Sequence, residues 1–322
     1  GGADCVIQLP APFAVAPAEI FAKGAIKILS AVPYVASLAF GCESGDAQSF
    51  EKAADFLIDE NDGFKIVLAE KLSSGNSYIK SFSAAFEACG GEKNLVSSPN
   101  NVLGLEYEKA IKRSGADIKI FPVRRIGGDF NDGELKENFS SASAIRKNIN
   151  CSGVKKNVPD YVYADLEYAV SDTEFESVLR HCLFKAEAVN LKRIYGCSEG
   201  LENKLKSLEN QTLDVIIEKA TSRRYSSSRI RRILVANALG LYQSDTERFL
   251  NDSLYIKPLA VKRERADEIL SALAKSLYPV ITNPHEDLLK GTALECFKKD
   301  INEFALYKNL THSDKKDYTL II

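Results

Sequence analysis

Apolar residues along the first half of the chain alternate between two patterns. Short apolar runs at residues 4–10, 34–40 and 117–125 have the length and composition of buried strands. The stretches between these runs have apolar residues at helical spacing, at 17–29, 49–60, 65–71, 78–89, 103–113 and 143–149. Strands that alternate with helices predict an α/β fold with a parallel sheet.

The second half has a different pattern, because helical spacing dominates it. Helices are predicted over residues 172–188, 199–208, 213–220, 228–241, 263–277 and 293–310. Short extended runs at 253–261 and 277–282 interrupt them. A polar stretch around Cys151 and Gly153 separates the two patterns. We therefore expect an α/β domain at residues 1–150 and a mainly helical domain at residues 151–322.

Composition narrows the class of protein. The chain has 322 residues, of which 45% are hydrophobic and 27% charged, with a net charge of −2. No apolar run reaches the roughly 18 residues of a membrane span, and no leader sequence is visible at the start. The seven cysteines are scattered and the three histidines stand apart from other ligand types, which predicts a reducing compartment and no metal site. We expect a cytoplasmic protein that does not enter a membrane.

A glycine follows the second predicted strand. Ligands of open parallel sheets bind beyond the carboxyl ends of the strands. Gly41, in the sequence Phe-Gly-Cys-Glu, would let a ligand approach the backbone closely. An ordinary tight turn explains the same residues, and for this feature alone it is the favoured interpretation.

Two arginines and a pair of glycines follow the third predicted strand, in the sequence RRIGGDFND from Arg124 to Asp132. The planar guanidinium group of arginine matches the oxygen atoms of a phosphate. A solvated strand end followed by a turn is an equally good interpretation of this segment alone.

Small hydroxyl residues precede a predicted helix in the sequence SSASAIRK, from Ser140 to Lys147. Backbone N–H groups, the hydroxyls of Ser141 and Ser143 and the guanidinium of Arg146 in the first turn would converge on one anion. Such donors would stabilise the charge that builds on a leaving pyrophosphate. The alternative is a serine N-cap followed by an ordinary surface arginine.

Two adjacent asparagines stand at the start of a predicted helix, in the sequence SPNN from Ser98 to Asn101. Helix capping is the simpler interpretation of this stretch alone, because asparagine is among the best N-cap residues. A polar contact to a ligand beside the positive end of the helix is the alternative.

Positive charge is concentrated between residues 221 and 234. The segment contains Arg223, Arg224, Arg229, Arg231 and Arg232, with Tyr225 among them. A solvated helix face usually mixes the two signs of charge, and this one does not. The segment therefore favours a surface that follows phosphates, with an aromatic ring for stacking on a base.

Common catalytic motifs are absent: the sequence has no Walker A motif, no G-x-G-x-x-G, no H-E-x-x-H and no G-x-S-x-G. No pair of a nucleophile and a base can be proposed from spacing. The catalytic residues therefore stay unassigned.

In their order along the chain, these stretches resemble the bacterial tRNA(Met) cytidine acetate ligases, a branch of the HIGH-type nucleotidyltransferase superfamily. The blocks that carry the resemblance are GADCVIQLPAPFAVAPAEIFAKGAIKIL, LAFGCESGD, SSPNNVLGLEYEKAI, RRIGGDF, SSASAIRK, SRRYSSSRIRRIL, YIKPLAV and DINEFALYKNL. The resemblance covers nearly the whole chain, and the asparagine block is its most specific part.

The resemblance implies a Rossmann-like nucleotidyltransferase domain followed by a helical domain that holds tRNA. It implies that ATP activates acetate as acetyl-adenylate, with Mg²⁺ expected, and that the acetyl group passes to N4 of the wobble cytidine of elongator tRNA(Met). Matching motifs place ATP at Gly41, Asn100, Arg125, Ile126, Ser141, Ser143 and Arg146. They place tRNA at Arg223, Arg224, Tyr225, Arg229, Arg231 and Arg232. Asn100 would then face the nucleotide, and Asn101 would cap the helix.

The sequence also departs from the family pattern. The family's N-terminal portion, about 60 residues with an Asn-Pro-Phe-His-x-Gly-His-type motif, is missing from the sequence, so we expect an N-terminally incomplete sheet. The catalytic histidines would belong to that portion, and without them this chain is expected not to catalyse adenylation. Gln8 stands where the family usually has glutamate, and Asn131 where it usually has histidine.

Two other functions remain open at this point. One is a related nucleotidyltransferase that acts on another small acid, for which the arginines would be idle. The other is a non-catalytic tRNA-binding protein. The sequence gives no indication of the oligomeric state.

Overall fold

The computed structural model of the chain describes residues 2–43, 45–59, 62–125, 133–136, 139–166, 172–284, 286–312 and 317–322. Ile126 and the glycine-containing segment 127–132, both discussed above, lie outside these ranges. Within the described part of the chain, no helix combines the length and the apolar character needed to cross a membrane.

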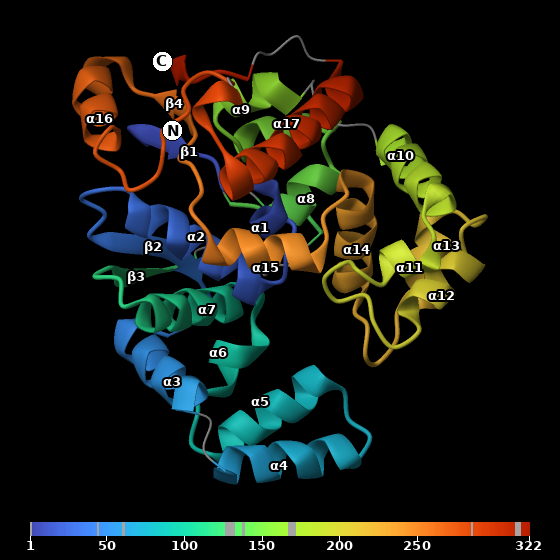
Figure 1. The fold of residues 1–322 in the computed structure, drawn as a ribbon. Coiled ribbons are helices and arrows are strands. Elements are labelled where there is room, and N and C mark those ends of the chain that lie inside the picture. The colour runs from blue at the N-terminus through green and yellow to red at the C-terminus, as the bar shows by residue number, and fades with distance from the viewer. Residues whose placement is uncertain are drawn as a thin grey trace.

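Two parallel strands form the sheet of the first half. β2 (Ser37–Cys42) pairs with β3 (Lys119–Arg124), so that Gly41 lies opposite Val123 and Cys42 opposite Arg124. β3 falls within its predicted run, and β2 overlaps its predicted run but continues past residue 40 to Cys42. The α/β fold with a parallel sheet is therefore confirmed, and most of the remaining chain is helical (Figure 1).

Helices connect and cover these strands. They are α1 (Ala11–Ala14), α2 (Ala18–Ala31), α3 (Ala47–Asp59), α4 (Asp62–Ser73), α5 (Tyr78–Ala88), α6 (Lys93–Ser97) and α7 (Pro99–Ser114). The apolar faces of α2 and α7 meet in a cluster that includes Ala22, Ile26 and Ile111. The antiparallel pair α4 and α5 projects from this layer at the lower end of the molecule (Figure 1).

The first predicted strand belongs to a different sheet from the one expected. β1 (Cys5–Ile7) pairs antiparallel with β4 (Pro258–Val261), and β4 pairs in parallel with β5 (Leu320–Ile321). The prediction that residues 4–10 form a strand of the parallel sheet is therefore wrong. An apolar run identifies a strand, but its partner is set by tertiary packing, which the run does not encode.

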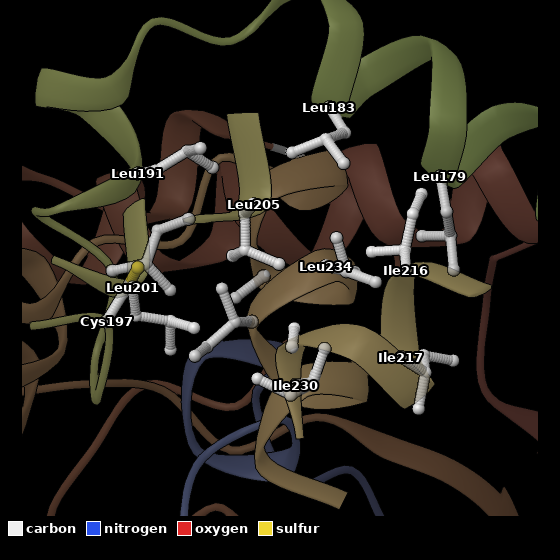
Figure 2. Packing of buried hydrophobic residues seen from close by; sticks show 14 of the residues in the cluster. Leu179, Leu183, Leu191, Cys197, Leu201, Leu205, Ile216, Ile217, Ile230 and Leu234 are labelled. Carbon is white, nitrogen blue, oxygen red and sulfur yellow. The ribbon is translucent and has the colours of Figure 1, made fainter. Parts of the chain in front are cut away.

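The second half is mainly helical, as predicted. The last helix before residue 150 is α8 (Ala142–Lys147). The helices of the second half are α9 (Asp160–Asp165), α10 (Asp172–Lys185), α11 (Ala188–Leu191), α12 (Leu201–Ser207), α13 (Leu213–Ala220), α14 (Ser227–Leu239), α15 (Gln243–Asn251), α16 (Ala266–Leu273) and α17 (Gly291–Thr311), with 3-10 turns η1 (Ser152–Lys156), η3 (Arg263–Arg265) and η4 (Glu286–Leu288). Leucine and isoleucine side chains from α10 to α14 interdigitate in one core (Figure 2). The spacing of apolar residues along the sequence did not predict α15.

A further core joins the two halves. Phe13 and Ile20, from α1 and α2, pack in one cluster with Phe249 of α15 and Phe297 of α17. The two ends of the chain also lie close together, beside β4 (Figure 1). The boundary near residue 150 stays a prediction, and the elements on its two sides share buried apolar surface.

Candidate functional site

The carboxyl ends of β2 and β3 bring Gly41 and Arg125 together. Arg125 follows β3 directly, and its backbone N–H donates to the carbonyl oxygen of Cys42 over 2.9 Å. A Cβ atom on Gly41 would lie 3.5 Å from Cγ of Arg125, so the arginine side chain passes over the bare glycine backbone. Both residues are exposed. A cationic side chain and an accessible stretch of backbone thus share one edge of the sheet.

The carboxylate of Glu43 joins this edge to the first turn of α7. It accepts from Nδ2 of Asn100 over 2.7 Å, from the Asn100 N–H over 3.4 Å and from the Asn101 N–H over 3.1 Å. Ser98, the N-cap residue, makes no side-chain capping bond. Glu43, in the loop after β2, therefore caps α7, because its carboxylate accepts hydrogen bonds at the positive end of this helix.

Asn101 does not cap α7, so this expectation is wrong. The helix begins at Pro99, which places Asn101 inside the first turn. Its side chain is completely buried and is held by the N–H of Glu43, which donates to Oδ1 over 2.9 Å, and by the carbonyl of Asn94, which accepts from Nδ2 over 3.0 Å. Asn101 is a buried bridge between the strand end and α6.

Asn100 occupies the position next to it but lies nearer the surface. Its Nδ2 group is bonded to Glu43, two residues beyond Gly41. The structure therefore places Asn100 beside the loop that follows β2, the strand that contains Gly41. Contact between Asn100 and a nucleotide stays a prediction.

The serine–arginine segment forms a short helix with a conventional cap. The hydroxyl of Ser141 is buried and accepts from the N–H of Ala144 over 3.0 Å. Arg146 lies in the last turn of α8, not in the first as expected, because the helix ends one residue later at Lys147. Its guanidinium donates to the Ser143 hydroxyl over 3.4 Å. Ser143 and Arg146 are thus in contact, whereas the hydroxyl of Ser141 caps the N-terminus of α8.

Figure 1 shows α8 apart from β2 and β3, on the side of the molecule where α1 and α14 lie. That the serine–arginine segment and the Gly41–Arg125 pair hold the same nucleotide stays a prediction. Ile126, also assigned to the nucleotide, lies outside the described residues.

The arginine segment surrounds the start of α14. The Ser226 hydroxyl caps this helix by accepting from the N–H of Arg229. The guanidinium of Arg229 donates through Nε over 2.8 Å and Nη2 over 2.5 Å to the carbonyl oxygen of Gly196, and it also lies 4.9 Å from the Tyr225 ring centroid. The Tyr225 hydroxyl donates to the carbonyl oxygen of Ser198 over 2.7 Å. Arg229 and Tyr225 are therefore fixed to the neighbouring loop.

The other arginines differ in their surroundings. Arg223 donates to the carbonyl oxygen of Gly75 over 3.1 Å, and Arg224 pairs with Glu199. Arg223, Arg224, Arg229 and Arg232 line one cavity, which neither Tyr225 nor the exposed Arg231 lines. Burial, followed by the proximity of Arg229, lowers the pKa of Arg232. The cluster is thus divided between a cavity and an outer surface.

Several residues that shape these regions gave no signal in the sequence. Glu43 stands in the motif that contains Gly41, but its pairing with α7 needs the folded chain. Lys80 lines the arginine cavity from α5 and belongs to no motif. Burial and then the charge of Glu43 raise the pKa of Cys42, which keeps this thiol protonated. Within the described ranges, no group of three or more histidine, cysteine, aspartate or glutamate residues is arranged to hold a metal ion.

Comparison with known proteins gives consistent matches. The family model described as HIGH Nucleotidyl Transferase matches residues 1–319. A tRNA(Met) cytidine acetate ligase of Thermoanaerobacter sp. (strain X514) is 31% identical over 321 residues, covering 95% of this chain and 79% of that protein. One of the same name from Clostridium perfringens is 31% identical over 342 residues, covering 99% of this chain and 83% of that protein.

Solved structures share the fold. The crystal structure of Thermotoga maritima TmcAL in its apo form superposes with a TM-score of 0.87 and 24% identity, covering all of this chain and 85% of that one. The same protein bound with alpha-thio ATP gives a TM-score of 0.85 and 23% identity.

The family model matches from residue 1, which gives no support to the expectation of an absent N-terminal portion. The extent of the model match and the identity to these relatives show that the chain belongs to the HIGH nucleotidyl transferase family.

Proposed function

We propose that the protein is an ATP-dependent ligase that acetylates N4 of the wobble cytidine of elongator tRNA(Met). One observation carries the proposal: Gly41 and Arg125 lie together at the carboxyl ends of two parallel strands, where α/β proteins bind nucleotides. The relatives named as tRNA(Met) cytidine acetate ligases, at about 31% identity, support the choice of substrates.

The proposed reaction has two steps. A carboxylate oxygen of acetate attacks the α-phosphorus of ATP, and pyrophosphate leaves with the electrons of the broken P–O bond. The N4 amine of cytidine then attacks the carbonyl carbon of the acetyl-adenylate. AMP leaves, and the nitrogen loses one proton. Acetate and ATP are thus consumed, and acetylcytidine, AMP and pyrophosphate are formed.

Three residues of this chain would hold the nucleotide. Gly41 presents backbone without a side chain, so a ligand can approach it closely. Arg125 supplies a permanent positive charge with donors that match phosphate oxygens. The bond from Nδ2 of Asn100 to Glu43 fixes the orientation of this amide, whose Oδ1 would contact the nucleotide. Mg²⁺ would accompany the triphosphate, because this ion is commonly bound through substrate phosphates.

The arginine segment would bind the tRNA. It offers guanidinium groups on the outer surface at Arg231 and in the cavity at Arg232, and the charge of the tRNA backbone is the natural partner for such a set. Ser141, Ser143 and Arg146 stay candidates for a phosphate contact of their own.

A transfer assay tests the proposal. The protein, expressed from its complete reading frame, is incubated with ATP, radiolabelled acetate and a tRNA(Met) transcript, and label in the RNA is counted after acid precipitation. The expected result is label in tRNA that depends on ATP and is lost in Arg125→Ala. A transcript with uridine at the wobble position is the control, because it lacks the N4 amine.

The other outcomes identify the alternatives. Label that enters a free small molecule but never tRNA indicates a nucleotidyltransferase with another acceptor. Tight tRNA binding without any consumption of ATP indicates a non-catalytic tRNA-binding protein. Either result would exclude the proposed activity.

A further inference from the structure

A cavity of about 910 Å³ lies between the turn that joins α4 to α5 and the beginning of α14. Arg223, Arg224, Arg229 and Arg232 line it from the second half of the chain, and Lys80 lines it from α5. The bond from Arg223 to the carbonyl oxygen of Gly75 connects its two walls. Segments that are far apart in sequence therefore form the cavity together, and Pro12 of α1 and residues 15–17 of the turn before α2 also line it.

Positive charge in this cavity lacks an equal negative charge. Neither aspartate nor glutamate is among the described residues that line it. Arg224 has an acidic partner, Glu199, and the pair stays largely exposed, with 75% and 60% of their side-chain surfaces accessible. The carbonyl oxygens that bind Arg223 and Arg229 carry no net charge. Several cations in one hollow repel one another and favour the entry of an anion.

Two of the five cations have no partner within the described part of the chain. No hydrogen bond or ion pair is formed there by the ammonium group of Lys80 or by the guanidinium group of Arg232. Arg232 is also half-buried, and a buried guanidinium without a partner is costly. An anion in the cavity would supply the missing hydrogen bonds.

Two helices begin at the wall of the same cavity. Ser77 caps α5, which has 11 residues, and Ser226 caps α14, which has 13 residues; both serines line the cavity. The positive ends of both helix dipoles therefore add to the charge of the side chains. Tyr78, in the first turn of α5, also lines the cavity with 59% of its surface exposed, and an aromatic ring in such a position can stack on a base.

We infer that this cavity binds phosphate groups of an RNA backbone, so that the α4–α5 pair and α14 grip the RNA between them. The inference rests on the proposed function for the identity of the RNA and adds a site and a second contact element to it. Lys80 and Ser77 join Arg232 as binding residues. The spread of cations over two walls suits a continuous polyanion, and the cavity is larger than one phosphate needs.

The experiment measures tRNA affinity as a function of salt for the wild type, Lys80→Gln, Arg232→Gln and a control, Lys52→Gln. Lys52 is an exposed lysine of α3 that does not line the cavity. Each phosphate contact lowers the slope of log K against log salt by about 0.7 to 0.9. We expect each cavity variant to flatten the slope by about that amount and to weaken binding about 5- to 10-fold near 0.1 M salt. The control keeps the wild-type values.

A second experiment measures the melting temperature with and without sodium tripolyphosphate. Together the two experiments distinguish failure of this inference from failure of the proposed function. If wild-type protein binds tRNA and both cavity variants keep its slope, the inference is overturned and the proposed function stands. If tripolyphosphate stabilises the wild type but not Lys80→Gln, while tRNA does not bind, the cavity holds free phosphates and the RNA inference is overturned. If the salt slopes of the cavity variants are flattened but the wild type transfers no acetyl group, the RNA-binding inference is supported and the proposed ligase activity is rejected. Lys80 is exposed, so its variant is expected to fold.

Discussion

Asn100 and Asn101 are neighbours in one helical turn, yet their side chains have different tasks. Asn101 is buried and bridges two backbone groups, whereas Asn100 has one side-chain bond, to Glu43, nearer the surface. A buried polar group that loses its partners costs about 1 to 3 kcal/mol, and an exposed bond costs less. Substitutions at the two positions can therefore separate a structural role from the proposed binding role.

We predict that Asn100→Ala weakens ATP binding about 10-fold, which corresponds to about 1.4 kcal/mol, and lowers the melting temperature by only a degree or two. Asn101→Ala should lower the melting temperature by about 4 to 8 °C, because it leaves buried groups without partners. Isothermal titration and thermal denaturation measure the two effects. Equal losses of affinity and stability in Asn100→Ala would show that this residue serves the fold alone.

Asp300 is the most unusual carboxyl group of the described chain. Its side chain is completely buried in α17, where it accepts from the N–H of Ala11 over 2.7 Å and from the hydroxyl of Tyr255. Burial raises the pKa of Asp300 from 3.8 to about 7, although the two hydrogen bonds and the charge of Lys257 oppose the rise. A raised pKa means that the folded chain holds this proton more tightly than the unfolded chain does.

Stability should fall as the pH rises from about 4 to about 7 and level off above, because ionisation of buried Asp300 costs free energy only in the folded state. We predict that the wild type loses about 2 to 4 kcal/mol of unfolding free energy between these limits, and that Asp300→Asn has a flatter profile. Urea denaturation at several pH values measures this. Identical profiles would exclude the assignment, and exposed Asp267→Asn is the control.

Among the elements, α7 packs unusually close to β2. Gly104 lies against the ring of Phe40, and a Cβ atom at this position would overlap that ring. The close contact holds the first turn of α7 where Glu43 can reach it. The close packing thus requires glycine at this position, and the proposed nucleotide site at the ends of β2 and β3 depends on that packing.

Gly104→Ala should therefore destabilise the protein by about 1 to 3 kcal/mol and weaken ATP binding as α7 moves away from β2. A smaller side chain at position 40 makes room, so Phe40→Leu should recover part of the loss when it is combined with Gly104→Ala. A double-mutant cycle of unfolding free energies measures the coupling. Strictly additive effects would mean that the two residues do not restrain each other.

At the scale of the whole molecule, the shared core argues for coupling between the two halves of the chain. Phe297 of α17 is completely buried among residues from α1, α2 and α15. We predict that Phe297→Ala costs about 3 to 5 kcal/mol and increases amide hydrogen exchange in α1 and α2 as well as in α17. Exchange that rises only beyond residue 150 would indicate that the halves fold independently.

The sequence was informative where a local pattern decides the structure. β2 and β3 could be predicted from apolar runs, and Gly41 and Arg125 could be expected to meet because both stand at the carboxyl ends of parallel strands. The partner of β1 could not be predicted, because β4 is more than 250 residues away. No pattern in the sequence indicated Lys80, because only the packing of α5 places this residue at the cavity that Arg232 also lines.

A crystal structure with a non-hydrolysable ATP analogue and a tRNA(Met) anticodon stem-loop tests the central claim most directly. We expect the nucleotide at the ends of β2 and β3, in contact with Gly41 and Arg125, and RNA phosphates in the cavity that Lys80 and Arg232 line. A nucleotide bound in the arginine cavity, with the ends of β2 and β3 empty, would contradict it.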